Sequence, residues 1–176
     1  NSVPGIDLPA TAFKFPTQMD PAYLAQSSIG QYEVAATPLQ MMMVASAIAN
    51  NGVLMKPHVV KSVTGSDLKV LQTVQPEQAG RPISEGAAKQ LKQMMENVVN
   101  DGTGSPAQVR GMTIGGKTGT AQSDPNRPPY AWFVGYASEP HVAVVAFVQS
   151  TSVERNDISG GRVAAPVFKA VVESLR

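Results

Sequence analysis

Ile114-Gly115-Gly116-Lys117-Thr118-Gly119-Thr120-Ala121-Gln122 is the stretch of this 176-residue chain on which the interpretation of its fold depends. It places one lysine, two threonine hydroxyls and a glycine on a short segment with apolar flanks. The doubled glycine before the lysine lets a ligand approach the backbone closely. The pattern predicts an extended segment that is able to hold a carboxylate-bearing acyl substrate along the edge of a strand.

The chain before this segment predicts helices and a hairpin. Thr37 is expected to cap a helix in which Pro38 takes the first position, where its missing N–H is harmless. The predicted elements are, in order, an irregular stretch (1–36), a helix ended by Asn51-Gly52, a hairpin of His58–Val63 and Leu68–Val74, and a second helix from Ser84 to about Val99.

The chain after this segment predicts an antiparallel sheet. Tyr130–Ala137 and Val142–Gln149 are strongly strand-like, and the second is apolar enough for burial on both faces. The turn between them is short enough for a direct antiparallel connection. A last helix is expected from about Val163 to Leu175. The C-terminal half therefore reads as strand, strand, strand and helix, with the helix returning across one face of the sheet.

The overall composition is that of an ordinary globular domain. Hydrophobic residues make up 43% of the chain, charged residues 15%, and the net charge is +1, which argues against disorder and against a nucleic-acid-binding surface. The absence of cysteine excludes disulfides and zinc–thiolate sites. No apolar stretch approaches the roughly 20 residues that span a bilayer. Since the chain begins at Asn1 without Met, we expect a processed or trimmed product whose membrane anchor, if any, lies outside it.

Residues 111–118 match the nucleotide-binding pattern G-x-x-x-x-G-K-[ST]. That motif functions only where a strand ends at the first glycine and a helix begins at the lysine, because the helix N-terminus supplies amide donors to the phosphates. The preceding 104–108 segment is loop-like, and Gly119 and Pro125 oppose a helix after the lysine. A P-loop domain is therefore a remote alternative that would require a helix after Thr118.

Ser66-Asp67-Leu68-Lys69 matches the S-x-x-K pattern of serine acyl-enzymes. In those enzymes the serine begins a helix, so that the lysine one turn later shares its face and accepts its proton. Ser66 instead follows Gly65 between two β-branched runs, which predicts an exposed hairpin turn. Ser66 is therefore interpreted as a turn residue and not as a nucleophile.

Six short blocks follow one another along the chain. They are Ser28–Gln31, Ala36–Gln40, Ala49–Gly52, Lys117–Gln122, Ala131–Tyr136 and Gly161–Phe168. In this order they resemble the transpeptidase domain of penicillin-binding proteins, and most of all class B, the monofunctional transpeptidases. The resemblance runs from about residue 5 to the C-terminus. Six ordered blocks are far more specific than one Lys-Thr-Gly triplet, which chance places in roughly a few per cent of chains this long.

The resemblance implies a penicillin-binding α/β (α+β) fold, similar to serine β-lactamases, with a five-stranded antiparallel sheet and helices on both sides. It implies cross-linking of peptidoglycan by acyl transfer from the D-Ala-D-Ala end of a stem peptide, through a seryl ester, to an amine on a neighbouring strand. The implied partners are stem peptides and β-lactam antibiotics, and the implied location is the outer face of the bacterial cytoplasmic membrane, in cell-wall synthesis for shape and division. No cofactor, metal or nucleic acid is implied.

The same resemblance assigns roles to individual residues. Lys117 would be a catalytic cation in the cleft that attracts the substrate carboxylate. The hydroxyls of Thr118 and Thr120 would bind that carboxylate, and Gly119 would leave room for the substrate backbone to pair with the strand edge. The N–H of Thr120 would be one of two oxyanion-hole donors. Gln122 would line the cleft further along.

The chain departs from the family pattern in one respect. The family's nucleophilic Ser-x-x-Lys and its Ser-x-Asn both lie upstream of the matched stretch, and the sequence holds no Ser-x-Asn. Residues 1–176 are therefore expected to form the C-terminal part of a transpeptidase domain that lacks the nucleophile-bearing part. Alone, the chain is expected to be inactive, with the rest of the domain as its partner.

A binding module on the same fold is the alternative function. A β-lactam sensor or an inactive relative would keep the fold and the acylable site without turning over a peptide donor. The block Ile29–Gln40 favours the transpeptidase, because it resembles transpeptidases specifically.

Overall fold

The computed structural model describes residues 3–122 and 126–176, so that the expectations for Asn1 and Pro125 lie outside the described residues. Its helices are α1 (Pro21–Ser28), α2 (Pro38–Ala49), α3 (Glu85–Asp101) and α4 (Ala165–Glu173), with a π-helical turn at Gly160–Ala164 and short 3-10 turns at Ser105–Ala107 and Arg155–Asp157. Its strands are β1 (Leu54–Met55), β2 (Ser62–Thr64), β3 (Val70–Thr73), β4 (Gln78–Gly80), β5 (Ile114–Ala121), β6 (Tyr130–Ala137) and β7 (Val142–Val148).

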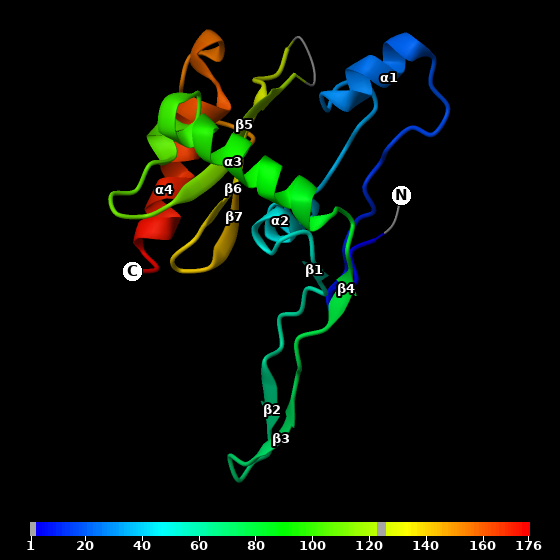
Figure 1. The fold of residues 1–176 in the computed structure, drawn as a ribbon, viewed down its shortest axis with the longest axis vertical. Coiled ribbons are helices and arrows are strands. Elements are labelled where there is room, and N and C mark those ends of the chain that lie inside the picture. The colour runs from blue at the N-terminus through cyan, green and yellow to red at the C-terminus, as the bar shows by residue number, and fades with distance from the viewer. Residues whose placement is uncertain (1–2, 123–125) are drawn as a thin grey trace.

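The main sheet is antiparallel in the order β5-β6-β7 and carries helices on both faces (Figure 1). On one face Tyr136 packs with Ile48 of α2 and Met95 of α3. On the other, the rings of Phe133 and Phe168 of α4 lie 4.7 Å apart. Phe133 and Tyr136 are three residues apart on β6, so their side chains point to opposite faces. The predicted strand–strand–strand–helix order is confirmed, and the described residues form three strands of the five implied by the family resemblance.

The burial of β7 differs from the prediction. We expected a strand buried on both faces, but most of its residues are half-buried and Ala146 is the buried one. Within the described residues β7 pairs with β6 alone and lies at the border of the sheet. An apolar run therefore identified the strand correctly without revealing that it is an edge strand.

The prediction of an irregular N-terminal stretch is wrong at α1. Asp20 caps this helix by accepting a hydrogen bond from the Tyr23 N–H at 2.8 Å, and Pro21 takes the first helical turn. The same combination of cap and proline correctly located α2, where Thr37 and Gln40 form a reciprocal capping box. In α3 the predicted cap Ser84 accepts from the Ala87 N–H at 3.1 Å.

The hairpin of β2 and β3 projects away from the sheet as an arm (Figure 1). Its strands are shorter than expected, but its turn is where the sequence placed it. Ser66 lies in that turn, and the Asp67 carboxylate accepts the backbone N–H of Lys69 at 3.2 Å. The S-x-x-K match is therefore a turn and does not begin a helix.

Tyr136 links β6 to α3 through its phenol. The side chain is 2% exposed, and its hydroxyl donates to Glu96 Oε1 at 3.1 Å. Burial first, and then the adjacent Glu96 carboxylate, raise the pKa of the Tyr136 phenol well above its ordinary value. The neutral phenol is therefore favoured by the folded state.

This gives a stability prediction at alkaline pH. A tyrosine in the unfolded chain ionises near pH 10. Since the folded pKa of Tyr136 is raised, its stabilisation is complete below about pH 10 and is lost as the pH rises towards the folded value. This one group should lower the free energy of unfolding by about 1.4 kcal/mol per pH unit in that window.

We expect Tyr136→Phe to remove this component of the pH dependence. Urea unfolding between about pH 8 and about pH 11 measures it. Tyr23→Phe, which removes an exposed phenol on α1, is the matched control and should keep the wild-type slope. An unchanged alkaline slope in Tyr136→Phe would contradict the assignment.

Candidate active-site strand

β5 carries the candidate site residues along an open border of the sheet. Lys117 lies in the middle of this strand, opposite Val134 of β6. Strand structure continues without a break from Ile114 to Ala121, so no helix begins at the lysine. The P-loop alternative is therefore wrong, because it required the helix N-terminus as the source of phosphate-binding amides.

The backbone orientation of β5 follows from its contact with Gly160. A Cβ built on Gly160 would lie 2.7 Å from both the N and the O of Gly119, and 2.2 Å from the O of Trp132. The N and O of Gly119 and the O of Trp132 therefore lie close to one another. This arrangement is expected when Gly119 and Trp132, which are opposite each other, exchange both hydrogen bonds of an antiparallel pair. Because such pairs alternate along a ladder, we infer that Thr118 and Thr120 direct their N–H and C=O groups to the open border.

The Lys117 side chain agrees with this orientation. Its Nζ donates to the carbonyl oxygen of Thr118 at 2.8 Å, and the side chain is exposed. Among the residues that the structure describes, no carboxylate forms an ion pair with Lys117. An ammonium has three donors, so a cation with unused donors lies beside the open border.

Thr118 and Thr120 share the face of the sheet on which α4 lies, since they oppose Phe133 and Ala131. Their hydroxyls are engaged with polar groups and do not point into packed apolar interior. The Oγ1 of Thr118 lies 2.7 Å from the Oγ1 of Thr103, and the Oγ1 of Thr120 accepts the N–H of Gly160 at 3.4 Å. Both hydroxyls therefore have fixed neighbours.

Gly119 and Gln122 complete the set predicted from the sequence. A Cβ on Gly119 would meet the Cβ of Trp132 at 3.3 Å, a tight contact that glycine avoids. Gln122 follows the end of β5 and is exposed. In the described structure no hydrogen bond joins Gln122 to Lys117 or Thr120. Its link to the other candidate site residues is therefore only its position after the same strand.

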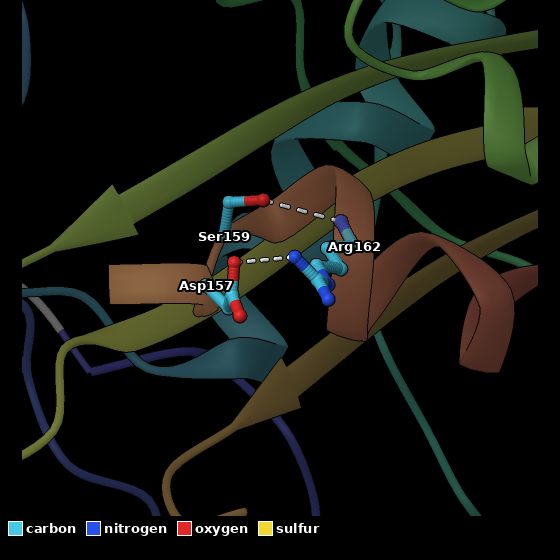
Figure 2. A network of polar contacts seen from close by, with 3 residues as sticks. All are labelled: Asp157, Ser159 and Arg162. Carbon is cyan, nitrogen blue, oxygen red and sulfur yellow. Dashed lines mark hydrogen bonds and ion pairs between the residues drawn. The ribbon is translucent and has the colours of Figure 1, made fainter. Parts of the chain in front are cut away.

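The π-helical turn Gly160–Ala164 is a part of the site that the sequence analysis did not find. Figure 2 shows the Asp157 side chain facing the guanidinium of Arg162, with the Ser159 hydroxyl accepting the Arg162 N–H. A Cβ on Gly161 would lie 2.3 Å from the carbonyl oxygen of Thr103. The available signal was the Gly160-Gly161 pair, because adjacent glycines allow close approach of two backbones.

Two hollows of the described structure lie away from the candidate strand. One hollow of about 570 Å³ lies beside Val99 and Lys169, and another of about 450 Å³ lies beside Met42 and Met55. Neither of these two hollows is lined by residues 117–122. Neither hollow therefore encloses a ligand on β5.

The described residues contain neither a membrane-spanning helix nor a cluster of metal-binding side chains. None of the helices is at once long and apolar enough to cross a bilayer. Nor do three or more His, Asp or Glu side chains gather where they could hold a metal ion.

The family model described as "Penicillin binding protein transpeptidase domain" matches residues 3–173. The match covers nearly the whole chain, and the fold is a portion of the penicillin-binding transpeptidase fold. The chain belongs to the penicillin-binding protein transpeptidase domain family. The resemblance inferred from the six sequence blocks is thereby confirmed.

Among its relatives is the "Peptidoglycan D,D-transpeptidase PbpA" of Mycolicibacterium smegmatis, which is 40% identical over 159 residues. This match covers 88% of the chain and 32% of the relative, so the chain spans about a third of the relative's length. It is also similar to solved structures of penicillin-binding protein A from M. tuberculosis. The imipenem and penicillin G acyl-enzyme complexes give TM-scores of 0.81 and 0.83 at 32% and 34% identity. Both matches cover 98% of this chain, and 40% and 41% of the other.

Proposed function

We propose that this chain supplies the Lys-Thr-Gly strand to the active site of a peptidoglycan D,D-transpeptidase. The observation that carries the proposal is the border of β5, where two ordered hydroxyls and a lysine that forms no ion pair with any described carboxylate lie along an extended edge. A peptide donor with a terminal carboxylate is complementary to it. The carboxylate pairs with positive charge and hydroxyl donors, and its backbone adds to the strand edge.

In this function the reaction proceeds through a seryl ester. The serine oxygen attacks the carbonyl carbon of the penultimate D-Ala, and the peptide C–N bond breaks. The terminal D-Ala leaves as an amine that takes up the serine proton. An amine of a neighbouring stem peptide then displaces the serine from the ester and forms the cross-link. β-Lactams would form the same kind of ester and block the second step.

Each site residue has a defined part in this scheme. The N–H of Thr120, directed to the open border, stabilises the oxyanion that forms on the attacked carbonyl. The hydroxyls of Thr118 and Thr120 bind the terminal carboxylate, and Lys117 supplies the compensating charge. Gly119 has no side chain and therefore leaves room for the backbone of the peptide donor beside the strand. Gln122 lines the more distant end of the border.

The nucleophile must come from elsewhere in the transpeptidase domain. Ser66 lies in the turn of the β2–β3 arm, and the chain has no Ser-x-Asn. We therefore propose that residues 1–176 form the C-terminal part of the domain. The remainder, on the same or a second polypeptide, would cover the open border of β5 on the outer side of the cytoplasmic membrane.

Covalent labelling with a fluorescent penicillin tests this division of roles. We expect no label on the 176-residue chain after denaturing electrophoresis, and stoichiometric label on a complete transpeptidase domain that contains it. Label on the 176-residue chain would show that it holds its own nucleophile. The absence of label on the complete domain would refute the proposed activity.

A further inference from the structure

We propose that Thr103 is a positioning residue that turns the Thr118 hydroxyl towards the substrate carboxylate. This inference rests on the proposed function and extends it to a residue outside the Lys-Thr-Gly strand. Thr103 follows Gly102, the C-terminal cap of α3, and its side chain is exposed. A hydrogen bond of 2.7 Å joins its hydroxyl to the hydroxyl of Thr118 on β5.

Proton counting gives this hydrogen bond a direction when an anion is bound. Each hydroxyl has one proton to donate, and a carboxylate accepts hydrogen bonds only. If Thr118 donates its proton to the carboxylate, the proton between the two hydroxyls must come from Thr103. The result is a chain from Thr103 to Thr118 to the carboxylate, in which each bond polarises the next.

The Thr120 hydroxyl is arranged in the same way by a backbone group. The Gly160 N–H can only donate, so Thr120 Oγ1 accepts there and keeps its own proton for a ligand. Thr118 and Thr120 lie on one face of β5 at positions about 7 Å apart. A carboxylate that accepts one hydrogen bond of about 2.7 Å on each oxygen spans this separation.

The segments that carry the Thr103 hydroxyl and the Gly160 N–H are held close to β5. A Cβ on Gly161 would lie 2.3 Å from the Thr103 carbonyl oxygen, so the π-helical turn packs directly against the Thr103 backbone. Gly104, the residue after Thr103, is buried, and its N–H donates to the carbonyl oxygen of Val98 at 3.0 Å. The ion pair between Asp157 and Arg162 joins the π-helical turn to the residues just before it (Figure 2). Thr103 therefore presents its hydroxyl from a fixed backbone.

The test compares two ligands that differ only in the carboxylate. The second-order acylation rate of the complete transpeptidase domain is measured with a penicillin and with its methyl ester, and their ratio reports recognition of the carboxylate. We expect Thr103→Val to lower this ratio about tenfold, the scale of one charge-assisted hydrogen bond. Thr103→Ser, which keeps the hydroxyl, should restore the ratio.

Thr73→Val on the β2–β3 arm is the matched control, because it removes an exposed threonine hydroxyl far from β5 (Figure 1). It should leave the acid-to-ester ratio unchanged. An equal loss of acylation with both ligands in Thr103→Val would show a structural role and overturn the inference, as would an unchanged ratio. A wild-type domain that is not acylated by the penicillin would refute the proposed function itself, which separates the two failures.

Discussion

Replacement of Lys117 by alanine should lower the acylation rate of the complete transpeptidase domain by a penicillin about a thousandfold, the range seen when one preorganised electrostatic group is removed from an active site. In the described structure no carboxylate neutralises this cation, and its Nζ lies against the Thr118 carbonyl at the open border of β5. Its charge is therefore available to a ligand. The time course of labelling by a fluorescent penicillin measures the effect.

Lys169→Ala provides a matched loss of a lysine. Lys169 lies on α4, 4.0 Å from the Glu173 carboxylate, and is not part of the border of β5. Its removal should change the acylation rate less than about twofold, because exposed ion pairs contribute little. If Lys117→Ala acylated as fast as Lys169→Ala, the catalytic role of Lys117 would be wrong.

Gly160→Ala should destabilise the chain by about 3 kcal/mol, since overpacking against groups that cannot move is among the most costly single changes. The added methyl would lie 2.2 Å from the Trp132 carbonyl oxygen and 2.7 Å from the N and O of Gly119. All three are backbone atoms, so no side-chain rotation relieves the contact. The π-helical turn would have to move away from β5.

Urea unfolding at neutral pH measures this change, and Gly86→Ala is the control. Gly86 lies in the first turn of α3, and a Cβ there would meet no atom within 4 Å. Alanine at this position should stabilise the helix by about 0.5 kcal/mol, because glycine loses more backbone freedom on folding. Unfolding midpoints that are the same for both variants would show that Gly160 does not pack against β5 as described.

Locally encoded features were predicted well. Thr37 and Ser84 cap their helices because a cap hydrogen bond spans only three residues. The limits of β6 at Tyr130 and Ala137 agree with its β-branched and aromatic pattern. The helix α1 was missed although Asp20 gives the same start signal, because most of its residues are exposed and no apolar periodicity supports the cap.

The sequence by itself determined the strand that carries Lys117, the order of the strands around it and the family to which the chain belongs. Only the tertiary structure decided which groups hold the two hydroxyls. Thr103 is 15 residues from Thr118, and Gly160 is 40 residues from Thr120. Periodicity and capping rules describe neighbours along one element, whereas these contacts arise where separate elements pack across β5. No spacing in the chain encodes them. Three threonines and Gly160 come together only when the elements that carry them pack against the sheet.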